Sequence, residues 1–258
     1  INKKNEGLLL ARKSGINIAK GDYIFHLDGD DYLPKNALEL LYEKALLTGA
    51  DIVRGNANHV TEDGAYISTF KYPYFDNLTG LQFLSYMLRY SYHSIWAALV
   101  KKECYVSNFI YPENVSIGED LIYMSQLSLF AHKVTYIEAV VYYYIKRGNS
   151  MINSEQKEDV QCQCDRYDQY VNFCCALDSI LVTYKSEFSE EVSNQLQLYL
   201  NDRIDERLFS LPVKIKERKR IVFSLYKKYF LFNIQVQKLV FKRSWKCYLS
   251  QLYKVRFL

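Results

Sequence analysis

The chain has 258 residues, of which 49% are hydrophobic and 24% are charged, and its formal net charge is +4. This size and composition predict a folded chain with one sizeable core and a smaller second module, and they exclude an intrinsically disordered chain. No run of about 18 uncharged apolar residues occurs, so no transmembrane span is predicted.

The first elements are a helix and a short strand. Small or apolar residues recur at helical spacing over Gly7–Ala19, and Gly21 follows, which predicts a helix that ends there. The run Tyr23–Leu27 is almost continuously apolar, as in a strand that is covered on both faces of a largely parallel sheet. The acidic segment Asp28–Asp31 then lies at the carboxyl end of this strand.

Helical and strand patterns continue to alternate until about residue 145. Beyond about Ser154 the pattern is helical to the end. We therefore predict an α/β fold in residues 1–153, with a mostly parallel sheet flanked by helices, and a mainly helical C-terminal module in residues 154–258. The predicted elements are a helix from Ala37 to about Gly49, strands at Asp51–Asn56 and Val60–Phe70 (the latter as a strand or hairpin), a helix at Leu81–Tyr90, a strand at Ile95–Val100, a helix after Gly118, and strands at Lys133–Ile137 and Val140–Ile145.

The last segment of the chain is strongly basic and aromatic. From Lys214 to Leu258 there are 13 Lys and Arg residues and a single acid, Glu217. Such a segment is suited to an anionic membrane surface or another polyanion, and the alternative is a solvated helix face.

The acidic segment after the first strand is the strongest chemical signal. Asp28, Asp30 and Asp31 place three carboxylates within four residues, so the folded chain requires a cation nearby. Mg²⁺ and Mn²⁺ prefer such oxygen ligands and commonly join protein carboxylates to substrate phosphates. The alternative is an Asp-Gly turn exposed to water.

Several blocks around this segment resemble the middle of a family 2 glycosyltransferase, in matching order. The resemblance implies a GT-A fold, in which Asp28 and Asp30 hold Mg²⁺ or Mn²⁺ and the nucleotide sugar. It also implies that Asn5, Arg12 and Asp31 contribute to donor binding. Family members usually open with a further strand-helix-strand unit, so we expect that the first part of the nucleotide-binding domain is missing from residues 1–258. The blocks are Asn5-Glu6-Gly7, Ala11-Arg12-Lys13-Ser14-Gly15-Ile16, Ala19-Lys20-Gly21-Asp22-Tyr23-Ile24, Leu27-Asp28-Gly29-Asp30-Asp31 and Pro34.

Three later segments extend the resemblance. Glu119 and Asp120 match a family pair whose Asp is the general base on the acceptor hydroxyl; the alternative is an acidic first helical turn. Arg147 and Ser150 match residues that meet the diphosphate, where the alternative is a solvated loop. Trp96 lies where relatives often carry an aromatic residue near the acceptor, and the alternative is a core tryptophan.

The resemblance implies an enzyme that transfers a sugar with inversion from a nucleotide-diphosphate sugar to a saccharide or a lipid-linked saccharide. The expected location is cytoplasmic or peripheral on the inner face of the membrane, and no nucleic-acid partner is expected. Two alternatives stay open at this point: a nucleotidyltransferase, which uses similar acids on a related sheet, and a truncated, inactive remnant that binds a membrane or a partner.

Overall fold

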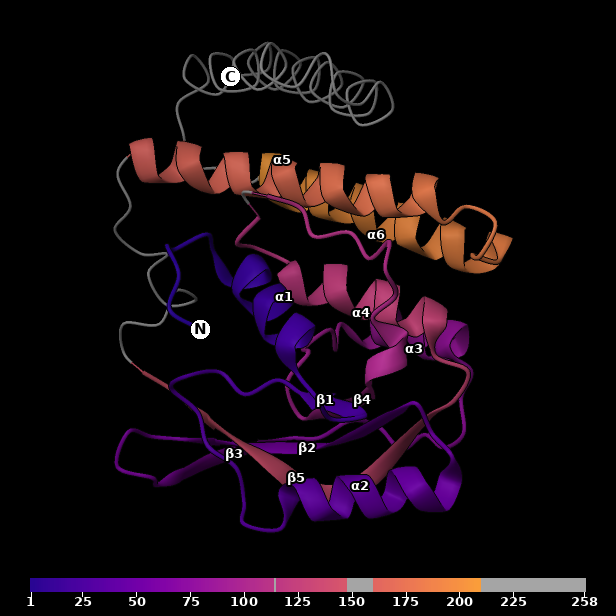
Figure 1. The fold of residues 1–258 in the computed structure, drawn as a ribbon. Coiled ribbons are helices and arrows are strands. Elements are labelled where there is room, and N and C mark those ends of the chain that lie inside the picture. Colours follow the sequence, from indigo (N-terminus) through magenta and orange to yellow (C-terminus); the bar gives the residue numbers. More distant parts are fainter. Residues whose placement is uncertain (114, 148–159, 210–258) are drawn as a thin grey trace, which may run out of the picture.

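The computed structural model describes residues 1–113, 115–147 and 160–209 (Figure 1). These residues form a five-stranded sheet with helices on both faces. The helices are α1 (Leu8–Ile18), α2 (Ala37–Thr48), α3 (Gly80–Tyr90), α4 (Glu119–Phe130), α5 (Val160–Thr183) and α6 (Glu190–Phe209), and a 3₁₀ turn, η1, covers Lys102–Cys104. The strands are β1 (Tyr23–Phe25), β2 (Ile52–Val60), β3 (Tyr66–Phe70), β4 (Ala98–Lys101) and β5 (Val134–Ile145).

The predicted α/β fold is confirmed, but the sheet is mixed rather than mostly parallel. β4 lies between β1 and β2 and is antiparallel to both, β3 forms an antiparallel hairpin with β2, and β5 is parallel to β2. It follows that β1, β2 and β5 all run in one direction. The predicted direction failed for β4, because an apolar run indicates burial on both faces of a strand and carries no information on its direction.

Several strand boundaries differ from the predicted elements: β2 extends beyond Asn56 to Val60, and β3 begins only at Tyr66. The last two predicted strands are one strand, β5, and the interruption between them is a bulge: Arg54 pairs with Tyr136, whereas Asn56 already pairs with Val140. Strand β4 begins at Ala98 and not at Ile95, because Ala97 has a left-handed φ of 55° that an extended strand does not accommodate.

Helix α2 covers one face of the sheet. Its buried residues Ala37, Leu41 and Ala45 recur every fourth position and pack against apolar residues of β2, β4 and β5. The helix ends at Gly49, which has a φ of 67° and donates its backbone N–H to the Ala45 carbonyl at 2.8 Å.

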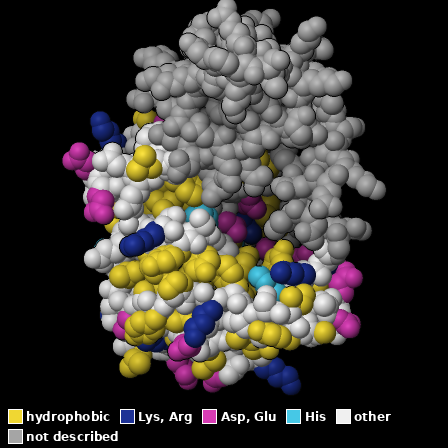
Figure 2. All heavy atoms as spheres, turned by 180° about the vertical axis from the view of Figure 1, so that it is seen from behind, with side chains coloured by type: hydrophobic (Ala, Val, Ile, Leu, Met, Phe, Trp, Pro, Cys, Tyr) yellow, Lys and Arg dark blue, Asp and Glu magenta, His cyan; other side chains and the backbone are white. Residues whose placement is uncertain are grey.

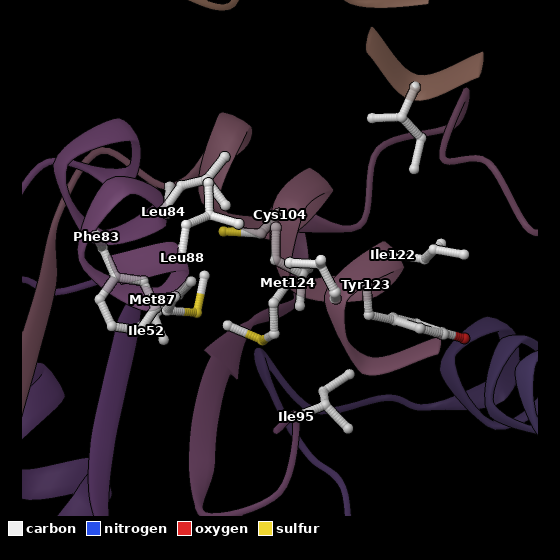
Figure 3. Close-up of a cluster of buried hydrophobic side chains, with 14 of the residues drawn as sticks. Ile52, Phe83, Leu84, Met87, Leu88, Ile95, Cys104, Ile122, Tyr123 and Met124 are labelled. Atoms are coloured by element: carbon white, nitrogen blue, oxygen red, sulfur yellow. The ribbon is translucent and has the colours of Figure 1, made fainter. Parts of the chain in front are cut away.

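The larger core lies on the opposite face, under α1, α3 and α4 (Figure 1). Figure 3 shows part of it, with Ile52 of β2, Met87 of α3 and Met124 of α4 lying close together and Ile95 beneath α4. Apolar residues of α5 and α6 continue the same cluster, so these helices form an outer layer over α3 and α4. Among the described residues, no helix combines the length and hydrophobicity needed to cross a membrane.

The predicted boundary between residues 153 and 154 falls outside the described residues, as does the basic segment 214–258. The division into two modules therefore stays a prediction. The packing of α5 and α6 on α3 and α4 shows that the described part of the second module shares its apolar core with the first.

Candidate active site

The acidic loop follows β1 at its carboxyl end, as the sequence predicted. The backbone N–H of Asp31 donates to the Asp28 carbonyl at 3.1 Å and closes a turn. Asp31 is half-buried, and both of its carboxylate oxygens accept hydrogen bonds, one from the Tyr142 hydroxyl at 2.8 Å and one from the backbone N–H of Ile145 at 2.9 Å. Asp30 is exposed. The loop thus holds one acid inside the fold and presents another to solvent.

The pair Glu119–Asp120 lies in the first turn of α4, also as predicted. Gly118 precedes it with a φ of 74°, and a Cβ at this position would lie 2.5 Å from the Phe173 ring, so glycine permits both the turn and the close approach of α5. Burial raises the pKa of Glu119 to about 7, and the neighbouring Asp120 adds to the rise. Burial also raises the pKa of Asp120, against the opposing effect of Arg12.

Arg12 joins the two acidic segments. Its Nη2 lies 3.1 Å from Oδ1 of Asp28, and its Nη1 lies 2.9 Å from Oδ1 of Asp120. The Arg12 side chain is 7% exposed, whereas the carboxylates are 30% and 27% exposed. A single guanidinium therefore holds the β1 loop and the start of α4 in one site, and it leaves both acids in contact with solvent.

Aromatic residues support Arg12 from the core side. The guanidinium lies 5.9 Å from the centre of the Tyr123 ring, and the Tyr123 hydroxyl donates to the Leu9 carbonyl at 3.0 Å, which ties α4 to α1. His26 is 8% exposed and its Nε2 lies 2.8 Å from the Tyr105 hydroxyl. Burial, together with the charge of Arg12, lowers the pKa of His26 to about 3, so this imidazole is neutral at physiological pH.

The other predicted site residues differ in how they relate to this cluster. Nη1 of Arg147 lies 3.9 Å from Oδ2 of Asp30, which brings the predicted diphosphate-binding arginine beside the acidic loop. Asn5 is exposed and its side-chain oxygen accepts from the backbone N–H of Gly7 at 3.0 Å. Among the described residues, no hydrogen bond joins Asn5 to the Arg12 cluster. Ser150 lies outside the described residues.

Trp96 is half-buried and packs among aromatic rings. Its ring is stacked 5.1 Å from that of Tyr142 and 6.0 Å from that of Tyr144, and Phe70 meets it edge-on at 5.4 Å. The predicted role near the acceptor and the alternative role in packing are thus both compatible with its position, since part of the side chain stays accessible.

Two residues to which the sequence analysis gave no role support the site. Tyr142 binds the acidic loop through its hydroxyl; the triple tyrosine 142–144 on an alternating strand was the available signal. Arg54 is fully buried in β2 and donates to the Ser94 carbonyl at 2.6 Å, which holds the segment that carries Trp96. The sequence could have indicated Arg54, because a single arginine within an apolar strand places a charge in the core that other groups must pair.

Asp28 and Asp30 fit a hard divalent cation. Both are carboxylates in one turn, and at least one is open to solvent, which suits an ion that binds one or two protein carboxylates and completes its coordination with phosphates and water. Within the described ranges no group of three or more His, Cys, Asp or Glu side chains is arranged around a metal position. Figure 2 shows the molecule from behind, and acidic side chains lie beside a basic one near the centre of this view.

Comparisons with known proteins find similarity to glycosyltransferases. Residues 1–100 match the family model described as Glycosyl transferase family 2. The cholesterol galactosyltransferase of Borreliella burgdorferi is 29% identical over 164 residues, which are 59% of this chain and 45% of that protein. The poly(ribitol-phosphate) beta-glucosyltransferase of Bacillus spizizenii is 25% identical over 208 residues, 80% of this chain and 30% of that protein. The chain thus spans less than half the length of either relative.

The structure of S. aureus TarS in complex with UDP-GlcNAc has a TM-score of 0.65 and a sequence identity of 19%, over 93% of this chain and 66% of that one. At this identity the similarity shows a common fold, of the GT-A type. The family match covers β1, the acidic loop and the sheet as far as β4, which are the elements that build one side of the Arg12 cluster. Residues 1–100, which carry the acidic loop, are thus similar to glycosyl transferase family 2, and the fold of the described residues is of the GT-A type.

Proposed function

We propose that this glycosyltransferase moves a sugar, with inversion, from a nucleotide-diphosphate sugar to a hydroxyl of a saccharide or of a lipid-linked saccharide. The observation that carries the proposal is the Arg12 bridge. It brings Asp28 of the acidic loop and Asp120 of α4, which lie far apart in the sequence, to the two ends of one guanidinium. A single displacement requires donor and acceptor at one site, and the two acids would serve them there: Asp28 the donor and Asp120 the acceptor.

Asp120 is the proposed general base. Its carboxylate accepts the proton of the acceptor hydroxyl as that oxygen attacks the anomeric carbon, while the bond from this carbon to the phosphate oxygen breaks and the nucleoside diphosphate leaves. One displacement inverts the configuration. Burial raises the pKa of Asp120 and so makes its carboxylate a better proton acceptor, while the charge of Arg12 keeps the carboxylate ionised.

Asp28 and Asp30 are proposed to hold Mg²⁺ or Mn²⁺ with the diphosphate. A bound divalent cation supplies positive charge to the leaving group. Arg147 lies next to Asp30, where its guanidinium would bind phosphate oxygens and orient them. Asn5, Arg12, Asp31 and Ser150 are proposed to complete donor binding, Asp31 by fixing the loop.

The relatives support glycosyl transfer, and the proposed saccharide acceptor rests on Trp96. Two relatives are named for a sterol and a poly(ribitol-phosphate) acceptor, and both names denote glycosyl transfer. Trp96 is half-buried, and a sugar ring can pack on the accessible part of its side chain. The basic segment 214–258 would bring the enzyme to the inner face of an anionic membrane, where lipid-linked acceptors would be within reach.

Product analysis tests the proposal. The protein is incubated with Mn²⁺ and, in turn, several nucleotide sugars, beginning with UDP-GlcNAc, the ligand named for TarS. We expect free nucleoside diphosphate to appear in the presence of a saccharide acceptor. Release of a sugar phosphate from the nucleotide sugar, or of pyrophosphate when a nucleoside triphosphate and a sugar phosphate are supplied instead, would identify a nucleotidyltransferase. Absence of any product with every donor would contradict an active transferase.

A further inference from the structure

The hydroxyl of Tyr142 lies between two residues of the acidic loop. It donates to Oδ2 of Asp31 at 2.8 Å and accepts the backbone N–H of Asp28 at 3.2 Å. Tyr142 is fully buried in β5, so its ring has a fixed position in the core. One phenol oxygen thus connects both ends of the turn that carries the proposed metal ligands.

Other residues near the end of β5 hold the same loop in place. The backbone N–H of Ile145 donates to Oδ1 of Asp31 at 2.9 Å. Tyr32 and Tyr143 exchange backbone hydrogen bonds of 2.9 and 3.3 Å, and their rings stack at 4.7 Å. Three neighbouring carboxylates repel one another, so a loop without such supports would spread apart. The side chain of Asp31 is used entirely in this attachment, which leaves Asp28 and Asp30 for a ligand.

The Tyr142 ring also packs against Trp96. The two rings are stacked at a centroid distance of 5.1 Å and an interplanar angle of 23°. Tyr142 therefore contacts both the donor loop through its oxygen and the aromatic residue on the proposed acceptor side through its ring.

We propose that Tyr142 is a positioning residue whose hydroxyl holds the Asp28–Asp31 turn in the conformation that receives Mg²⁺ or Mn²⁺ with a nucleoside diphosphate. The inference rests on the proposed function and adds to it a group that touches neither the metal nor the substrate. Residues that orient metal ligands through hydrogen bonds commonly affect metal affinity by about 10- to 100-fold.

The variant Tyr142→Phe removes the hydroxyl and keeps the ring. Tyr136→Phe is the matched control: Tyr136 lies on the same strand, is 3% exposed, and donates its hydroxyl to Oδ1 of Asn56 at 2.7 Å. Tyr142→Phe loses the two hydrogen bonds to the acidic loop, whereas Tyr136→Phe loses one hydrogen bond within the sheet and none to the loop. Both melting temperatures should fall, and that of Tyr142→Phe should fall further, because one of its lost bonds goes to a carboxylate.

Mn²⁺ binding to the full chain is measured by electron paramagnetic resonance, with Mn²⁺ alone and with Mn²⁺ plus UDP. We expect Tyr142→Phe to weaken binding about tenfold or more and Tyr136→Phe to leave it unchanged. A second variant, Asp31→Asn, removes the charge at the other end of the hydrogen bond and should weaken binding in the same direction.

Equal affinity in wild type and in Tyr142→Phe would overturn the inference, and so would an equal loss in both tyrosine variants, which would indicate a general effect on the strand. If the wild-type protein itself binds no Mn²⁺ under either condition, the proposed metal site is wrong and the inference falls with it. The wild-type measurement thus separates failure of the proposed function from failure of the role assigned to Tyr142.

Discussion

Replacing Arg12 by methionine tests the bridge between the two acidic segments. Methionine keeps much of the length and apolar character of the side chain and removes the guanidinium, so that Asp28 and Asp120 lose their shared cation. Both stability and activity should fall, since the bridge positions the loop after β1 and the start of α4 at the same time.

The magnitude follows from exposure. A hydrogen bond to a charged group contributes about 1.5 to 3 kcal/mol, and Arg12 makes two. The carboxylates are 30% and 27% exposed and regain water when the cation is removed, so we expect a net loss of about 2 kcal/mol in the free energy of unfolding. For a chain of this length, such a loss lowers the melting temperature by about 4 to 8 °C.

Thermal unfolding of Arg12→Met is compared with that of Lys13→Met. Lys13 is the next residue on α1, is exposed, and lies 4.8 Å from the centre of the Tyr111 ring, so its removal deletes the same charge outside the cluster and should cost less than about 1 kcal/mol. Arg12 also opposes the rise in the pKa of Asp120, so Arg12→Met should move the acid limb of the kcat profile to higher pH. Equal melting temperatures for the two variants, with an unmoved acid limb, would refute the bridge.

Three further predictions concern the metal site, Glu119 and the basic tail. Asp30→Ala should abolish Mn²⁺-dependent binding of a nucleotide sugar in calorimetric titration, and unchanged affinity would remove the metal-site interpretation. Because folding raises the pKa of Glu119 to about 7 from its ordinary 4.5, its ionisation should destabilise the folded state as pH rises through this interval. The melting temperature of Glu119→Gln should therefore equal that of the wild type near pH 4 and exceed it near pH 8. A difference in melting temperature that is the same at both pH values would contradict the raised pKa. Deleting residues 214–258 should abolish sedimentation with anionic liposomes at low salt; if the intact chain does not sediment, or if the deletion has no effect, the segment does not bind membranes.

Local patterns predicted where the two acidic segments lie in the fold, and the family resemblance selected them as candidate site residues. The acidic loop at the end of an apolar run and the acidic first turn after Gly118 were both located correctly, because each depends on short-range sequence signals. The hairpin between β2 and β3 was likewise visible in Glu62-Asp63-Gly64, where Gly64 has a φ of 85°.

The contacts between these parts could not be predicted from patterns. The spacing of α1 indicates an amphipathic helix, but it does not tell which residue Arg12 meets, since its partners lie 16 and 108 positions away. In the same way, the alternation of β5 does not distinguish Tyr142, which points into the core, from a tyrosine that covers an edge. The direction of β4 is also decided by tertiary pairing with β1 and β2.

The kinetic effect of Asp120→Asn tests the central claim most directly. The amide keeps the size of the side chain and can still accept a hydrogen bond from Arg12, but it is not a base. We predict that kcat for sugar transfer falls by about 10² or more while the Kd for the donor stays near the wild-type value, because a general base acts chiefly in the transition state. A variant with near-normal kcat would contradict the account, and Asp120 would then be an acidic helix start and not the catalytic base.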